Sequence, residues 1–308
     1  MRKKLLILVK IAVSIVVILF LYERISYDFQ GFISAFNIYA QNIFIILLVS
    51  ILMPINWLME VLKWKYSLKP ITKISISEAS VGVFSGIALG FITPHAIGDY
   101  FAKVFSISHE NRKSALGLIL ISRMLQMLPT LLFGLIAVYF ISDFSLSEFD
   151  FSYSSSFALS SIIGFVIFGF FLLLYFNRNH PRVKDYLWPI KKLGLKLFVL
   201  LSALSIVRYI IFSLQFLILL SVLELKINLF HQFMGIAFMF LIKSILPTFN
   251  FLNDLGVREV SIAFFFEKLE VSVAPIIAAG LILWLINIAV PAAIGLFYIP
   301  KLKLIYKK

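Results

Sequence analysis

The stretch GFITPHAIGD, residues 90–99, decides the fold because it interrupts an apolar segment that is long enough to enter a membrane. Pro94 cannot donate a backbone hydrogen bond, and glycines flank it, so the stretch breaks a helix. A second breaker cluster, PTFNFLNDLG at residues 247–256, interrupts a later apolar segment. In each cluster a proline precedes a glycine and an acid, and an apolar helix then resumes. We expect the resumed helices to start near residues 98 and 256.

The composition places these segments in a membrane. Of the 308 residues, 61% are hydrophobic and 14% are charged, whereas a soluble domain is about half apolar and a quarter charged. A soluble globule of this size could not bury so much apolar surface. An ordinary soluble enzyme, a disordered chain and a disulfide-stapled secreted domain are therefore excluded. The absence of cysteine also excludes thiolate metal sites and thiol catalysis.

A membrane span needs roughly 20 apolar residues. Eight segments are candidates, and they cover residues 5–22, 43–62, 79–97, 115–141, 157–176, 197–222, 229–249 and 273–298. Lys and Arg mark the cytoplasmic side of a membrane protein. Both stretches that flank the third segment, 63–78 and 98–114, are basic. The stretches 223–228 and 267–270, on either side of the other broken segment, are poor in bases.

This charge pattern predicts that the two broken segments return to the side from which they enter. The expected fold is an all-α polytopic membrane protein with six full spans and two re-entrant helical hairpins. Eight plain helices, two of them kinked at proline, are the alternative. The protein is expected to lie in the cell membrane, with both termini on its cytoplasmic side. The net charge of +13 then forms a cytoplasmic collar, and we expect no nucleic-acid partner.

The order span–hairpin–span occurs twice, with opposite orientations. It predicts one membrane domain, residues 1–308, that contains inverted repeats at about 43–141 and 197–298. Inverted repeats whose broken helices meet near the midplane are a transporter design. Irregular backbone at that depth is tolerated only where it is buried in protein or lines a cavity.

Charged residues at membrane depth are the candidate site, because each is costly in lipid and marks a function by default. Arginines offer bidentate donors to phosphate or carboxylate, and the resumed helices offer free N–H groups. The acids can pair with these arginines, cap the helices or accept a proton. A salt-bridge network that only fixes the fold is the alternative. The candidate substrate-binding residues are Thr93, Pro94, Gly98, Asp99, Arg123, Arg208, Asp254, Gly256, Arg258 and Glu259.

Other sequence features point to structure rather than catalysis. Gly82, Gly86 and Gly90 recur at four-residue spacing, which leaves a bare helix face and predicts close packing. There is no Walker loop, HExxH, G-x-S-x-G or His/Cys metal spacing in the sequence. We therefore expect no catalytic residue, no metal and no cofactor, although an enzymatic role is not excluded.

The two breaks resemble the signatures of a known family. Leu89-Gly90 followed by Thr93-Pro94 and Gly98-Asp99 is similar to the first signature, and the run LGVRE at residues 255–259 is similar to the second. The family is the flippase-like membrane domain of lysylphosphatidylglycerol synthases, which also occurs as stand-alone proteins. The resemblance covers nearly the whole chain. Where the family often has Glu-Arg-x-x-Asp, this chain has Ser122, Arg123 and Gln126, so only the arginine of that pattern is present.

The resemblance implies that the protein translocates or binds a lipid headgroup. The implied lipid is an anionic or aminoacylated phospholipid, or a polyprenyl-linked lipid. Lysyl transfer is not implied, because that activity belongs to a separate cytosolic domain, and we expect none in a chain that ends at Lys308. The alternative is a membrane subunit or scaffold of a lipid-modifying transferase that adds aminoacyl or glycosyl groups, with that transferase as its partner.

Overall fold

The computed structural model describes residues 19–93, 96–143, 188–190, 192–245 and 251–302, except for the side chains of residues 141–143 and 251–254. This part of the chain is helical and contains no strand. The predicted spans at 5–22, for the most part, and at 157–176 lie outside it.

Four helical stretches in the described part are long and apolar enough to cross a membrane. They match the predicted spans at 43–62, 115–141, 197–222 and 273–298. The first three are α3 (Ile43–Ser67), α6 (Arg112–Asp143, preceded by η2, His109–Asn111) and α9 (Leu195–Ser221). The fourth consists of α12 (Ala274–Trp284), the π-helical turn η4 (Leu285–Ala289) and α13 (Val290–Leu296), with η5 (Ile299–Lys301) after it.

The first broken segment forms two short helices, α4 (Ile76–Ile92) and α5 (Ile97–Phe105). A capping box starts α4: the Ser75 hydroxyl accepts a hydrogen bond from the Glu78 N–H, and the Glu78 carboxylate accepts one from the Ser75 N–H. The chain turns at Ala96, whose φ of 51° is left-handed, so α5 begins one residue before the predicted start.

The glycine stripe of α4 packs against α5, as the sequence predicts. A Cβ at Gly82 would collide with Ser106, and a Cβ at Gly86 would overlap Asp99. The contacts run in opposite directions along the two helices, so α4 and α5 are antiparallel. The absence of side chains on this stripe therefore lets Asp99 lie directly against the backbone of α4.

The second broken segment forms α10 (Leu229–Ile245) and α11 (Phe251–Glu267). They also pack against each other, with the Phe238 ring 6.0 Å from that of Phe265. The prediction that the resumed helix starts near residue 256 is wrong: α11 begins at Phe251, and Gly256 lies buried inside it. A glycine within a helix costs only about 1 kcal/mol, and burial of the surrounding apolar residues outweighs this cost.

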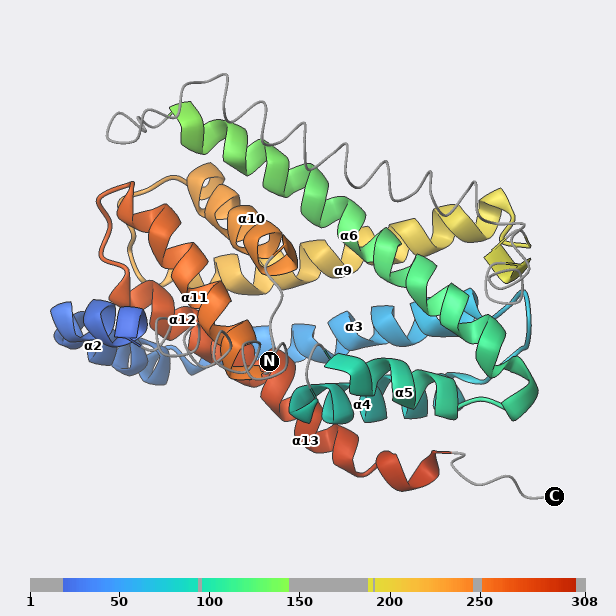
Figure 1. Cartoon of the computed structure of the whole chain (residues 1–308). Coiled ribbons are helices and arrows are strands. Elements are labelled where there is room, and N and C mark those ends of the chain that lie inside the picture. Colours follow the sequence, from blue (N-terminus) through green and yellow to red (C-terminus); the bar gives the residue numbers. More distant parts are fainter. Residues whose placement is uncertain (1–18, 94–95, 144–187, 191, 246–250, 303–308) are drawn as a thin grey trace, which may run out of the picture.

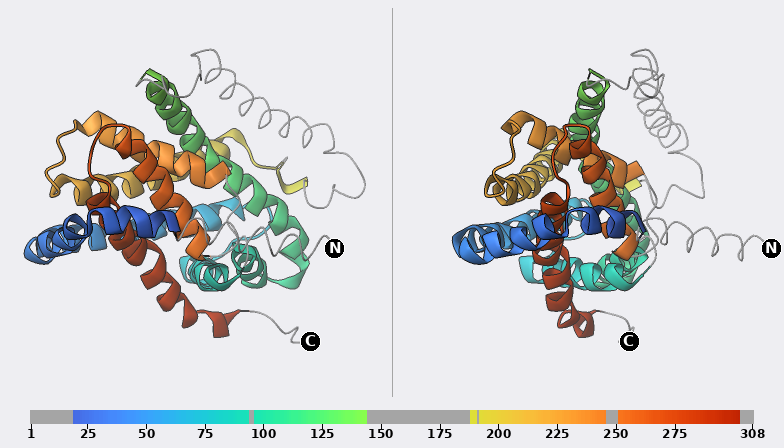
Figure 2. Two further views of the ribbon diagram at one scale, coloured as in Figure 1. Left: turned by 60° about the vertical axis from the view of Figure 1, so that its left-hand side comes forward. Right: turned by 90° about the vertical axis from the view of Figure 1, so that its left-hand side faces the viewer.

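The two helix pairs lie on opposite sides of the long helices (Figures 1 and 2). The helices that precede the pairs, α3 and α9, pack on each other. The helix that follows each pair packs on the other pair, since α6 contacts α10 and α13 contacts α4. The views agree that the broken end of α4–α5 and the first turn of α11 approach each other. A further helix, α2 (Phe29–Gln41), packs against α12.

Two apolar clusters form the core. One is built mainly from α9, α10, α11 and α12, and the other from α3, α4 and α6. Polar and charged side chains of α3, α5, α6 and α9 are buried as well, and these residues form the site.

Candidate functional site

Glu60 of α3 is the centre of a buried charge network. Its Oε2 atom lies 2.8 Å from Lys63 Nζ and 2.8 Å from Arg208 Nη1. Its Oε1 atom accepts a hydrogen bond of 2.8 Å from Lys103 Nζ. Glu60 is 5% exposed. One carboxylate therefore joins α3, α5 and α9.

Asp99, in the first turn of α5, is the second acid of this network. It accepts hydrogen bonds from Lys103 Nζ at 3.2 Å and from the guanidinium of Arg123 on α6. Lys63 Nζ donates to Gln126 Oε1, also on α6, at 2.6 Å. We refer to this set as the charge network: Glu60, Lys63, Asp99, Lys103, Arg123 and Arg208.

Neutral polar groups extend the charge network to the last predicted span. Arg208 Nε donates to Asn56 Oδ1 at 3.1 Å, and Asn56 Nδ2 lies 3.5 Å from Asn287 Oδ1. The backbone carbonyl of Asn287 accepts a hydrogen bond of 3.0 Å from Trp57 Nε1. Asn287 lies in the π-helical turn η4, where the helical hydrogen-bond ladder is altered. The turn thereby docks α12–α13 onto α3.

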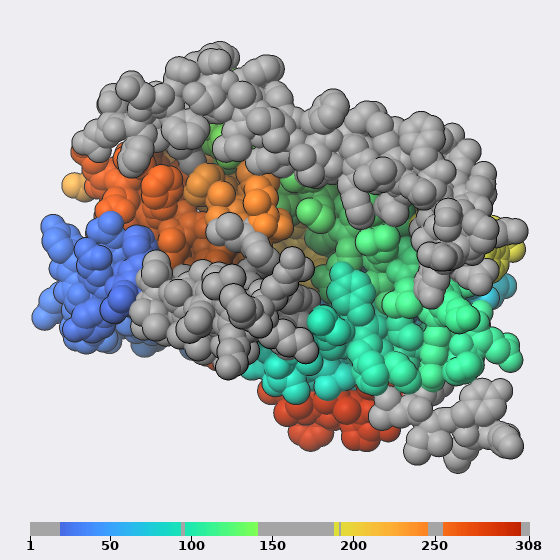
Figure 3. Space-filling model, in the orientation of Figure 1, coloured from blue at the N-terminus to red at the C-terminus, as the bar shows by residue number. Residues whose placement is uncertain are grey.

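The two arginines form the accessible edge of the charge network. The side chain of Arg123 is 40% exposed and that of Arg208 is 18% exposed, whereas that of Lys63 is 2% exposed. The Arg208 guanidinium carbon lies 4.7 Å from the Trp57 ring centroid, and that of Arg123 lies 5.4 Å from the Tyr100 ring centroid. Such stacking holds a guanidinium in place and leaves its edge donors available. Figure 3 shows α5 and α6 side by side on the face of the molecule that it views.

Arg258 and Glu259 of α11 lie outside the charge network. Each is 1% exposed, and neither charged group has a hydrogen-bond partner among the described residues. The Arg258 guanidinium carbon is 5.4 Å from the ring centroid of Phe212, which lies one turn of α9 beyond Arg208. Burying a charged group costs several kcal/mol even after relaxation. Because neither group has a hydrogen-bond partner among the described residues, each is a candidate to bind a proton or a ligand.

Glycine at position 280 makes room for the Glu259 carboxylate. A Cβ on Gly280 of α12 would overlap both carboxylate oxygens. The close approach of α11 and α12 therefore depends on this glycine, and it directs Glu259 toward α12 while Arg258 faces α9.

The structure does not bring all the predicted site residues together in one place. Asp99, Arg123 and Arg208 meet in the charge network, whereas Arg258 and Glu259 form a second centre. Thr93 and Gly98 hold the break together, since the Thr93 hydroxyl donates to the Leu89 carbonyl at 2.7 Å and accepts from Gly98 N–H at 2.8 Å. Two further predictions, Pro94 and the side chain of Asp254, lie outside the described residues.

Sequence reasoning missed Lys63 and Lys103. It assigned both to the basic cytoplasmic stretches, but they lie inside α3 and α5 and are 2% and 4% exposed. Their spacing carried a signal: Lys63 follows Glu60 by three residues and Lys103 follows Asp99 by four, which places each pair on one helix face. The buried amides Asn56 and Asn287 have no comparable signature in the sequence.

The described residues contain no group of three His, Cys, Asp or Glu side chains that could hold a metal ion. A family model described as the lysylphosphatidylglycerol synthase TM region matches residues 7–295. The chain belongs to this family. No curated protein and no solved structure matches the chain.

Membership of the lysylphosphatidylglycerol synthase TM region family confirms the predicted resemblance over almost the whole sequence. It agrees with the four apolar helices that can cross a membrane, and it identifies an integral membrane protein with a lipid-related role. Four members of the charge network, Glu60, Lys63, Arg123 and Arg208, lie in helices that are long and apolar enough to cross a membrane.

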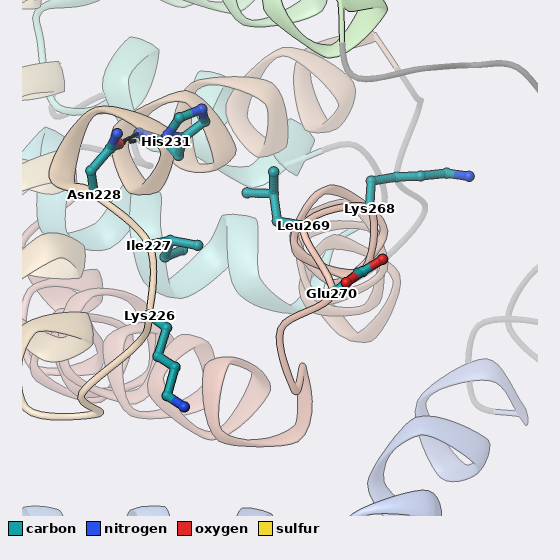
Figure 4. Close-up of a pocket in the computed structure, with 7 residues that line it drawn as sticks. All are labelled: Lys226, Ile227, Asn228, His231, Lys268, Leu269 and Glu270. Carbon is teal, nitrogen blue, oxygen red and sulfur yellow. Dashed lines mark hydrogen bonds between the residues drawn. The ribbon is translucent and has the colours of Figure 1, made fainter.

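A shallow pocket of about 440 Å³ lies away from the charge network. It is formed by the loop before α10 and the loop after α11 (Figure 4). Lys226 extends from the first loop, and Lys268 and Glu270 extend from the second. The two ends of the α10–α11 pair thus emerge next to each other.

Proposed function

We propose that the protein is a flippase-like membrane protein that binds an anionic lipid headgroup at the charge network and moves it between the leaflets. The observation that carries this proposal is the partly exposed arginine edge of a buried charge network. Exposed arginine at membrane depth is unfavourable unless an anion or water compensates it. A lipid phosphate supplies that anion while its acyl chains stay in the bilayer.

We propose that each helix pair is a re-entrant hairpin. At 1.5 Å per residue, the 17 residues of α4 and the 9 residues of α5 span only about 26 and 14 Å, less than the roughly 30 Å of a hydrocarbon core. The antiparallel packing of α4 and α5 supports a return to the side of entry. The shared pocket at the outer ends of α10 and α11 supports the same topology for the second pair.

The packing pattern supports an inverted repeat. One unit comprises α3, the α4–α5 pair and α6, and the other comprises α9, the α10–α11 pair and α12–α13. Equivalent helices make equivalent contacts: α3 with α9, α6 with α10, and α13 with α4. This pattern supports repeats at about residues 43–141 and 197–298. The distribution of Lys and Arg in the sequence supports cytoplasmic termini.

The proposed path of the headgroup runs from the charge network toward Arg258. Arg123 and Arg208 bind the phosphate oxygens, while Glu60 and Asp99 keep the guanidinium groups in position. Arg258 offers donors one turn further along α9, beside Phe212. Asp99 is engaged by two cations, whereas the Glu259 carboxylate has no hydrogen-bonding partner among the described residues. Of these two acids, Glu259 is therefore the better candidate to accept a proton.

Reconstitution tests this function directly. Full-length protein in liposomes is expected to move a fluorescent anionic phospholipid between leaflets, and Arg123→Gln and Arg208→Gln are each expected to slow this movement at least about tenfold, which corresponds to about 1.4 kcal/mol. Arg24→Gln is the matched control, because Arg24 pairs with the half-exposed Glu267 outside the charge network. Unchanged movement in both test variants would refute the assignment of the site.

A further inference from the structure

The charge network is not neutral. Its side chains include four cations, Lys63, Lys103, Arg123 and Arg208, but only two carboxylates, Glu60 and Asp99. The remaining hydrogen-bonding partners, Gln126 and Asn56, are amides and carry no charge. Arg258 and Glu259 lie outside the charge network and carry opposite charges, so they leave its balance unchanged. With all four basic side chains protonated, the charge network has two more positive than negative charges.

Because most of the charge network is buried, its excess positive charge attracts anions strongly. Within the charge network only Arg123 is substantially exposed, so water screens the other cations weakly. In such surroundings the electrostatic attraction for an anion grows with each charge the anion carries. Arg123 and Arg208 form the accessible edge, and an anion placed there compensates the whole network.

We propose that the headgroup bound by the charge network is a dianionic phosphate, either a lipid phosphomonoester or a lipid pyrophosphate that carries two charges. This inference rests on the proposed function and names its class of substrate. A phosphodiester headgroup carries one charge and leaves one excess cation uncompensated. A lysyl headgroup carries ammonium groups beside its single phosphodiester charge and therefore offsets less of the excess positive charge, so the network disfavours it.

The excess positive charge of the network depends on the residue at position 126, where the neutral Gln126 stands beside Lys63. Gln126 lies 2.6 Å from Lys63, at a position where a carboxylate would pair with that ammonium. Gln126→Glu adds one negative charge with almost no change in shape. The charge network of the variant is expected to have one excess positive charge, which the single negative charge of a phosphodiester would compensate.

The test measures headgroup preference in full-length protein. The protein is placed in nanodiscs of phosphatidylcholine, and binding of phosphatidic acid, phosphatidylglycerol, lysylphosphatidylglycerol and free inorganic phosphate is compared at pH about 8, where a phosphomonoester carries two charges. Wild-type protein is expected to bind phosphatidic acid about tenfold more tightly than phosphatidylglycerol and to bind lysylphosphatidylglycerol least. Gln126→Glu is expected to reduce the preference for phosphatidic acid about tenfold. Gln126→Met removes the hydrogen bond to Lys63 without changing the charge, so this variant is expected to keep the preference for phosphatidic acid.

Each other outcome overturns one specific claim. Equal binding of phosphatidic acid and phosphatidylglycerol, or similar effects of Gln126→Glu and Gln126→Met, refutes the dianion proposal. If lysylphosphatidylglycerol binds most tightly, the charge argument is wrong, although a headgroup site remains. If inorganic phosphate binds and no lipid does, the ligand is a soluble phosphate. If no phosphate compound binds, or if Arg123→Gln binds all of them normally, the proposed function itself fails.

Discussion

Glu60 is the residue on which the charge network depends most, because three cations from three helices share its carboxylate. Glu60→Gln leaves Lys63, Lys103 and Arg208 without this counter-charge. Breaking a buried ion pair by removing one partner costs about 3–5 kcal/mol, so we expect a loss of stability of this size in a denaturant titration in detergent. Glu267→Gln, which removes one partner of a half-exposed pair with Arg24, is expected to cost less than about 1 kcal/mol. Equal losses would show that the network contributes no more than a surface pair.

Gly280 provides a second test at the scale of one residue. A Cβ there overlaps the Glu259 carboxylate, and overpacking of a close contact costs about 1–3 kcal/mol. Gly280→Ala should therefore destabilise the protein by that amount, and Glu259→Ala in the same chain should relieve the overlap. Gly194→Ala is the control, since nothing lies within 4 Å of a Cβ at that position. Additive losses in the double variant would disprove the contact.

Individual charges show where sequence reasoning succeeds and where it stops. Arg123 and Arg208 could be predicted to have partners, because arginine deep in an apolar segment needs one, and they pair with Asp99 and Glu60. That they bind substrate stays a prediction. Lys63 and Lys103 could not be distinguished from loop charges by composition alone, since both lie close to the ends of their helices. Their burial results from the packing of α3, α5 and α6 against one another, which a single sequence does not encode locally.

At the scale of elements, hydrogen bonds stabilise the connection between α4 and α5. The Thr93 hydroxyl bridges the end of α4 and the first turn of α5 through two hydrogen bonds. Thr93→Val keeps the shape but removes both bonds, and each is worth about 0.5–1.5 kcal/mol. We expect a lower thermal midpoint, together with slower lipid movement because Asp99 lies in the same turn.

Ser80→Ala serves as the control for this substitution. The Ser80 hydroxyl donates to the Ile76 carbonyl within α4 in a solvent-exposed hydrogen bond, so its loss is expected to change stability by less than about 0.5 kcal/mol. If Thr93→Val were equally harmless, the hydrogen bonds of the break would contribute nothing to holding the pair together.

The ends of the elements were harder to predict than their existence. Both breaks were found from proline and glycine, and α5 begins close to the predicted position. In the second pair, Gly256 was taken as the start of the helix, but α11 begins at Phe251. Glycine permits a break without requiring one, and apolar contacts around Gly256 decide the outcome in favour of helix.

At the scale of the whole molecule, charge and packing constrain the same topology. Lys69 and Lys73 precede α4, Arg112 and Lys113 begin the helix that follows α5, and the α4–α5 contacts are antiparallel. The stretches before α10 and after α11 are both poor in bases and line one pocket. A simple alternation of eight spans would place the two ends of each pair on opposite sides of the membrane. Re-entrant pairs keep the two ends of each pair together.

The absence of cysteine makes this topology directly testable, because a single introduced thiol reports its own side of the membrane. Ser77→Cys and Glu110→Cys, at the two ends of the α4–α5 pair, are exposed positions and should react with a membrane-impermeant maleimide only after the cells are opened. Lys226→Cys and Lys268→Cys, at the ends of the α10–α11 pair, should react in intact cells. If the two ends of either pair label from opposite sides, that pair crosses the membrane. The inverted repeat would then fail, although the charge network, which rests on side-chain contacts, would stand.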